Sequence, residues 1–233
     1  MNCILCQLPK PLRKSHIIPE FAYRGLYDEK HRMVSFGPLS PEKHSSRLQK
    51  GLRDRLLCDG CEGFINDNFE KPFLSYFIDG NALDALKGKR VATLTRINYS
   101  AFKLFHLSVL FRAHHAMIPN FGEVYLGASE SPIREMLLNK NAGKDWEFPI
   151  VCSAITQPDG EIWKDIIAPA HSVVLGSQQA FLFTFAGCQW LYFLSSVLTP
   201  EIDKRCLKES GELPIAKSDW LAMSHYQSMA GSV

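Results

Sequence analysis

Several features that define whole classes of protein are missing from this sequence. It has no internal repeat and no low-complexity tract, and its 46% of hydrophobic and 21% of charged residues exclude a disordered chain. It has neither a Gly-x-x-x-x-Gly-Lys loop nor a Gly-x-Ser-x-Gly elbow, so a P-loop nucleotide hydrolase and a serine hydrolase are not supported. We expect the 233 residues to fold as one large domain, or as a small module joined to a larger one.

The first residues also lack a targeting signal. Met1-Asn2-Cys3-Ile4-Leu5-Cys6 has neither the basic nor the apolar region of a secretory signal, so we expect a cytoplasmic protein. The chain has seven cysteines, an odd number, and four of them form two tight pairs near the N-terminus. In a chain without a signal, this pattern favours metal binding over disulfides.

One long segment has no charge at all. No charged residue occurs in 166–200, and its apolar part, 180–198, is long enough to span a bilayer. However, phenylalanine recurs at every second position of 181–185, and an Ala186-Gly187 break follows. We therefore predict two buried strands joined by a turn, and no membrane association.

The remaining pattern predicts an α+β protein. The best helix runs from Tyr99 to Met117 and is apolar over most of its circumference, and a shorter helix runs from Ser131 to Asn139. A short helix at 81–87 and a fraying one from Lys217 onward are also expected, with an exposed insertion at 38–46. Strand-like segments lie at 148–156, 161–168, 172–175, 181–185 and 189–194.

The N-terminal third differs from the rest in composition. Residues 1–75 are loop-rich and cysteine-bearing, and we treat them as a separate module beside a mixed helix-and-sheet domain at 76–233. Segment 10–55 holds eleven Lys or Arg against five Asp or Glu, whereas 91–233 holds eleven against thirteen. A phosphate backbone would be met at such a basic segment, although ordinary solubility is the alternative. The side chains that we assign to nucleic-acid contact are Arg13, Lys14, Arg53 and Arg55.

Two Cys-x-x-Cys pairs carry the strongest chemical signal. Cys3 and Cys6 form the first pair, and Cys58 and Cys61 form the second. Each pair places two thiolates about one turn apart, so together they can close a tetrahedral shell around one zinc ion. Metal binding would supply folding energy to a segment with few apolar residues of its own. Buried or redox-active thiols are the alternative.

The residues around these pairs resemble a known superfamily. Lys14-Ser15-His16-Ile17-Ile18-Pro19-Glu20-Phe21 lies between the pairs, and Leu57-Cys58-x-x-Cys61-Glu62 leads into a polar-bearing helix. This order, over residues 3 to about 72, resembles the HNH endonuclease superfamily, and more closely a group of bacterial HNH-like proteins of about this size. The resemblance implies a treble-clef ββα module stapled by structural zinc.

The same resemblance implies an activity: metal-dependent hydrolysis of phosphodiester bonds in DNA. In that superfamily the histidine before Ile-Ile-Pro is the general base that activates water, which makes His16 the base here. A divalent ion, Mg²⁺ or Mn²⁺, stabilises the developing charge on the phosphate. The superfamily usually has Asp or Glu before that histidine and Asn or His after the second pair, where this sequence has Ser15 and Glu62. We therefore expect Glu62, helped by Asn66, to hold the catalytic ion.

Spacing adds a third residue to this polar face. Glu62, Asn66 and Glu70 recur at four-residue intervals, so they line one side of the segment if it is helical. A solvated polar face, opposite apolar residues such as Phe69, is the alternative.

The resemblance also implies a biological role and partners. We expect from it an effector in defence against phage, with DNA, or RNA, as the substrate. A defence-system protein or a second copy of the chain would then be the protein partner. The competing hypothesis is a non-catalytic zinc module, in which Ser15 and Glu62 mark a lost metal site and the basic residues bind nucleic acid or an acidic protein.

Overall fold

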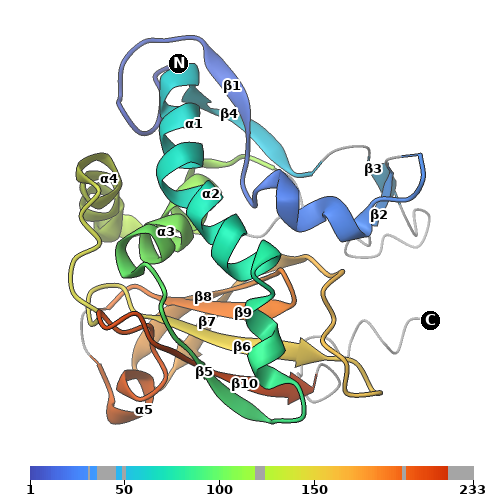
Figure 1. Ribbon diagram of the computed structural model, residues 1–233. Helices are drawn as coiled ribbons and strands as arrows, with labels where there is room; N and C mark the ends of the chain where they lie inside the picture. Colours follow the sequence, from blue (N-terminus) through green and yellow to red (C-terminus); the bar gives the residue numbers. More distant parts are fainter. Residues whose placement is uncertain (31, 36–45, 49–50, 119–123, 196–197, 220–233) are drawn as a thin grey trace.

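A six-stranded sheet makes up the lower half of the molecule in the view of Figure 1. The computed structural model describes residues 1–30, 32–35, 46–48, 51–118, 124–195 and 198–219. Strands β5 (Val91–Leu94), β6 (Ile150–Thr156), β7 (Ala168–Leu175), β8 (Gln178–Phe185), β9 (Cys188–Phe193) and β10 (Leu213–Asp219) lie in the order β5-β10-β6-β9-β8-β7. Neighbours are antiparallel except β10 and β6, which run parallel. The predicted α+β class is confirmed.

The N-terminal residues form a smaller ββα unit. Strands β1 (Leu12–His16) and β4 (Arg53–Cys58) pair antiparallel, and α1 (Asp59–Ile65) follows β4 directly. A 3₁₀ helix, η1 (Glu20–Leu26), leads to the short pair β2 (Met33–Ser35) and β3 (Ser46–Leu48). The run that begins with α1 stays helical to residue 79 through η2 (Asn66–Glu70), α2 (Lys71–Phe73) and η3 (Leu74–Asp79), of which η2 and η3 are π-helical.

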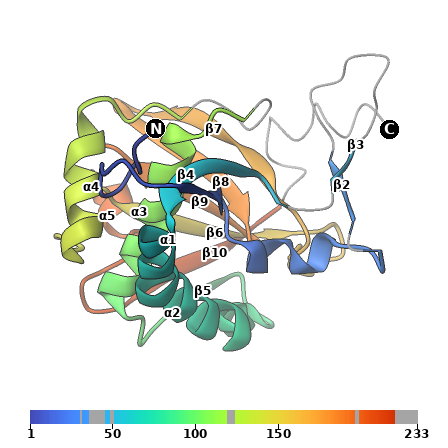
Figure 2. The ribbon, with the colours of Figure 1, turned by 90° about the horizontal axis from the view of Figure 1, so that it is seen from above.

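Helix α3 (Tyr99–His115) lies between the ββα unit and the sheet (Figures 1 and 2). Its side chains contact both neighbours. The ring of Phe105 stacks on that of Phe73 in α2, with the ring centroids 3.9 Å apart, and it also contacts Phe185 of β8. The other helical segments are η4 (Ala82–Leu86), η5 (Gly127–Ser129), α4 (Glu130–Asn139) and α5 (Pro200–Asp203).

One buried apolar cluster runs through the whole fold. It includes Leu57 and Ile65 of the ββα unit, Phe105 of α3 and Ile215 of β10. Residue 75, where we divided the chain, falls inside the continuous helical run, between Phe73 and Phe77 of this cluster. The division into two domains stays a prediction.

The uncharged segment folds as predicted. Strands β8 and β9 form an antiparallel hairpin, and Ala186 and Gly187 at its turn have positive φ angles of 54° and 75°. The phenylalanines at 181–185 are buried, and Gln179 is the one exposed residue of β8. Within the residues described, none of the helices combines the length and apolar character that crossing a membrane requires.

Several predicted elements differ from those observed. Residues 217–219 end β10 instead of beginning a helix, because Leu213 and Ile215 alternate into the core beside β6. Of the strand predicted at 161–168, Ile162 forms an isolated bridge and Ala168 begins β7, and the helix at 81–87 is a 3₁₀ helix. Helix α4 begins at Glu130, since η5 continues directly into it. The insertion at 38–46, apart from Ser46, and the tail after 219 lie outside the described residues.

Candidate active site and metal centre

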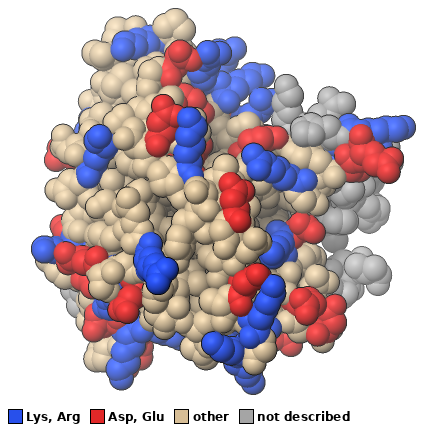
Figure 3. All heavy atoms as spheres, viewed as in Figure 1, with Lys and Arg blue, Asp and Glu red and all other residues tan. Residues whose placement is uncertain are grey.

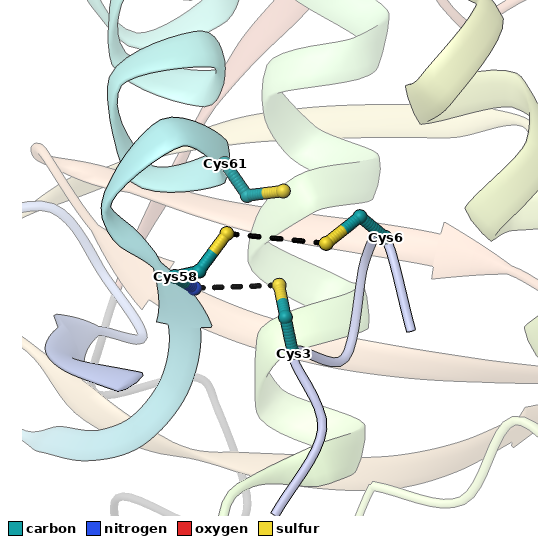
Figure 4. Close-up of side chains that lie close together, drawn as sticks. All are labelled: Cys3, Cys6, Cys58 and Cys61. Carbon is teal, nitrogen blue, oxygen red and sulfur yellow. Dashed lines mark hydrogen bonds between the residues drawn. The ribbon is translucent and has the colours of Figure 1, made fainter. Parts of the chain in front are cut away.

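Four cysteines from three elements meet at one end of the ββα unit (Figure 4). Cys3 and Cys6 lie in the N-terminal turn, Cys58 is the last residue of β4, and Cys61 lies in the first turn of α1. All four Sγ atoms are within 4.8 Å of one another, and those of Cys6 and Cys58 are 3.9 Å apart. Zinc–sulfur bonds of about 2.3 Å place tetrahedral sulfurs about 3.8 Å apart. The group therefore can hold a metal ion such as zinc.

The backbone around the cysteines is arranged for this grouping. The Gln7 amide donates to the Cys3 carbonyl at 2.8 Å, with Gln7 at a φ of 57°, which turns the N-terminal loop so that Cys6 faces Cys3. The Cys58 amide donates to the Cys3 Sγ at 3.3 Å and links the two pairs. Burial and the neighbouring thiols raise the pKa of Cys61, so a cation is needed to keep the group in its thiolate form.

His16 ends strand β1 and lies against a carboxylate. Its Nε2 is 2.6 Å from Oε2 of Glu20, and the two side chains are 21% and 42% exposed. The chain turns at Pro19 into η1, which brings Glu20 back onto the imidazole. The Tyr27 hydroxyl donates to the other carboxylate oxygen, Oε1, at 2.8 Å, and accepts from the Gly51 amide at 3.1 Å. One hydrogen bond and one ion-pair contact thus connect Tyr27 through Glu20 to His16, and we call this series of contacts the relay.

The electrostatics keep this histidine neutral. The pKa of His16 is lowered to about 4: burial is the largest cause, Glu20 opposes it, and the charges of Arg53 and Arg112 add to the lowering. Two lone pairs would repel each other at 2.6 Å, so we assign the proton of the neutral ring to Nε2, which faces the carboxylate. The lone pair on Nδ1 is left to accept a proton. At neutral pH the ring is therefore in the form that a general base requires.

The backbone of His16 is held by a buried arginine. Arg112 of α3 donates from Nη1 to the His16 carbonyl at 2.7 Å, and the same Nη1 forms an ion pair with Glu70, 2.8 Å from its Oε1. The Arg112 side chain is 1% exposed, and its Nε donates to the Ser108 carbonyl at 3.2 Å. The third residue of the predicted polar face, Glu70, is thus engaged by α3.

The other two residues of that face have different partners. The buried Ser15 hydroxyl donates to Oε2 of Glu62 at 2.6 Å, and the Leu57 amide donates to Ser15 Oγ at 3.3 Å. The Asn66 amide nitrogen is 3.4 Å from Oδ1 of Asp67. Among the described histidine, cysteine, aspartate and glutamate side chains, the four cysteines are the one group of three or more that could hold a metal.

The basic residues lie on the strand pair β1–β4, which carries His16. Lys14 faces Arg55 across β1 and β4, and His16 faces Arg53, so these four share one face. Lys14 and Arg55 are exposed, and the Arg55 guanidinium donates to the Leu12 carbonyl at 3.2 Å. Arg13 falls in a register irregularity and pairs with Asp59. Figure 3 shows basic side chains gathered over this end of the molecule, with acidic ones among them.

Three residues of the site were not predicted from the sequence: Glu20, Tyr27 and Arg112. Glu20 follows His16 by four positions in the quoted motif, which was the available signal, although the intervening residues are not helical. Arg112 is, like Lys103, a buried cation on a largely apolar helix, and such a residue needs a buried partner.

No family model, curated protein or solved structure matches the chain. The relation to the HNH superfamily therefore stays a prediction from the motifs around the cysteines and His16.

Proposed function

We propose that the chain is an HNH-like endonuclease whose residues 1–75 form a zinc-stapled treble-clef module and whose base is His16. The observation that carries this proposal is the relay from Tyr27 through Glu20 to His16. It leaves a neutral, partly exposed imidazole whose Nδ1 can accept a proton. A carboxylate behind a histidine fixes the tautomer and stabilises the imidazolium that forms on proton transfer.

In the proposed reaction, water attacks the phosphorus of a DNA phosphodiester. Nδ1 of His16 takes one proton from the water, its oxygen bonds to phosphorus, and the bond to the leaving sugar oxygen breaks. That oxygen then takes a proton from solvent. Glu20 meets the positive charge on the ring through its 2.6 Å contact with Nε2, and the Tyr27 hydroxyl keeps the carboxylate in place. Burial raises the pKa of Tyr27 to about 12, so this hydroxyl stays a donor.

The basic face of the β1–β4 strand pair favours the proposal of a polyanionic substrate. Lys14 and Arg55 are like charges placed directly opposite each other on adjacent strands, an arrangement that costs free energy when nothing lies between them. A phosphate that bridges the two removes this cost, and it would lie on the face that carries His16.

Two kinds of metal belong to this proposal. Zinc on the four cysteines is structural, because all four positions of a tetrahedral shell are filled by sulfur. A Mg²⁺ or Mn²⁺ ion, when bound, would neutralise charge on the phosphate, and it needs only one or two carboxylates besides water and phosphate oxygens. Glu62 would supply one, since the Ser15 hydroxyl engages Oε2 and Oε1 is the second carboxylate oxygen; Asn66 would assist.

A non-catalytic zinc module is the second candidate function. The hydrogen bond from Ser15 to Glu62 favours it, because it satisfies within the protein a carboxylate that would otherwise meet an ion. In this case Lys14, Arg53 and Arg55 bind nucleic acid or an acidic protein, and His16 plays no part.

The test is cleavage of supercoiled plasmid, linear single-stranded DNA and RNA, each with Mg²⁺, Mn²⁺ or EDTA. The nuclease proposal predicts metal-dependent nicking of DNA, lost in Glu62→Ala with zinc content unchanged. Retention of DNA binding without cleavage of any substrate, from protein that holds one zinc per chain, would support the second candidate. The role in defence against phage, with a protein partner or a second copy, stays a prediction.

A further inference from the structure

The C-terminal region contributes a buried cation to the proposed site. Arg112 belongs to α3, outside residues 1–75, yet its Nη1 lies 2.7 Å from the His16 carbonyl and 2.8 Å from Glu70. Its Nε and Nη2 are directed to the carbonyl and hydroxyl of Ser108, one turn earlier on α3. The guanidinium therefore joins three segments: the end of β1, η2 and α3.

Stability alone is a weak reason for such a group. Burying a charge is costly, and replacing a buried ion pair with packed apolar side chains is often neutral or stabilising. A planar guanidinium does, however, fix the directions of its hydrogen bonds, because its N–H donors form a rigid fork. Here one arm of that fork is directed at the backbone of the proposed base itself, where β1 ends and the chain turns toward Glu20.

We propose that Arg112 is a positioning residue for His16, through which α3 holds the base in its working orientation. This inference rests on the proposed function. It gives residues 76–233 a defined part in the reaction: the helix that supports the sheet also fixes the carbonyl of the base. Three charged groups act on the His16 ring, namely Glu20 from η1, Arg53 from β4 and Arg112 from α3, and of these Arg112 alone bonds to its backbone.

The same helix provides a matched control. Lys103 lies nine positions before Arg112, is also 1% exposed, and donates to the Tyr99 hydroxyl at 3.0 Å and to the Lys144 carbonyl. It is a buried cation of equal exposure, and both of these hydrogen bonds are made to residues outside the ββα unit. Lys103→Met and Arg112→Met thus both remove a buried charge from α3, but only the second removes a bond to His16.

The experiment compares wild type, Arg112→Met, Arg112→Lys and Lys103→Met, each at one zinc per chain. The first readout is the NMR signal of the His16 imidazole, assigned by its loss in His16→Gln. The second is kcat and KM on a DNA oligonucleotide. We expect Arg112→Met to move the His16 signal and to lower kcat by about 100-fold with KM within about 3-fold, since a misplacement of about 1 Å costs that much. Arg112→Lys should restore part of kcat, and Lys103→Met should change neither readout.

Two results would overturn the inference. One is an unmoved His16 signal in Arg112→Met, and the other is an equal movement in Lys103→Met. If Arg112→Met does not fold, the double variant Glu70→Gln/Arg112→Met, which leaves no lone buried carboxylate, replaces it with the same expectations. If the wild type cleaves no DNA, the proposed function fails, and the NMR comparison still decides whether Arg112 positions His16.

Discussion

Replacing Cys61 by serine is expected to unfold the N-terminal strands while the six-stranded sheet stays folded. The sulfurs lie within 4.8 Å of one another and a tetrahedral zinc site needs about 3.8 Å, so they close on an ion by moving about 1 Å at most. Binding of structural zinc contributes about 10–16 kcal/mol in small zinc modules, as much as the whole stability of a typical domain. A serine hydroxyl does not replace the thiolate, so most of this free energy is lost.

What opposes this loss is apolar burial. Leu56 and Leu57 of β4, with Ile17 and Ile18 directly after β1, are buried in the common core, and each contributes about 1.5–3 kcal/mol, about 6–12 kcal/mol in total. Their sum is smaller than the zinc contribution, so β1 and β4 should open, whereas β6, β8 and β9 keep their own core around Trp190.

Zinc content by mass spectrometry and amide hydrogen exchange, measured per peptide, check this prediction. Cys61→Ser should hold no zinc at submicromolar concentration and should exchange rapidly over 1–30 and 51–65, with slow exchange kept over 150–193. Cys206→Ser is the control, because Cys206 is buried and lies outside the zinc group. Full zinc in Cys61→Ser, or uniform loss of protection over the whole chain, would refute the reasoning.

Three further predictions concern the site. Glu20→Gln should lower single-turnover cleavage by about 10²–10⁴-fold, the range for losing general-base catalysis, and an unchanged rate would remove Glu20 from the mechanism. His16→Gln should reduce the acid sensitivity of the free energy of unfolding measured in urea. The folded pKa of about 4 lies below the unfolded 6.5, so His16 lowers the stability of the wild type as pH falls from 6.5 to 4. An equal fall in the free energy of unfolding in wild type and variant over this range would contradict this. Lys14→Gln should reduce the slope of log affinity against log salt by about 1, whereas Lys140→Gln, at the exposed C-cap of α4, should leave it unchanged.

Local patterns in the sequence predicted the parts of the fold that local chemistry decides. The two Cys-x-x-Cys pairs meet because each needs only one turn of chain, and one zinc site needs four sulfurs. Alternating phenylalanines and the Ala186-Gly187 turn decided in favour of strands β8 and β9. The apolar helix at 99–117 ends at His115, two residues before the predicted end.

The contacts that complete the site are not local, and the sequence pattern did not reveal them. Arg112 meets the His16 carbonyl across 96 positions of sequence, a pairing that only the packed position of α3 produces. Strand β10 was missed because its alternation is short and its parallel partner, β6, lies far away in the chain. The π-helical turn at 66–70 changes the helical repeat on which the Glu62, Asn66 and Glu70 spacing argument depended.

The central claim, that His16 is the base of a nuclease, is tested most directly by plasmid cleavage with wild type beside two histidine variants. His16→Ala removes the proposed base, and His115→Ala removes another half-buried histidine, 3.3 Å from Glu130 and outside the site. We predict metal-dependent nicking by wild type and His115→Ala and none by His16→Ala, with one zinc per chain in all three. Equal nicking by His16→Ala, or none by zinc-loaded wild type, would contradict the claim.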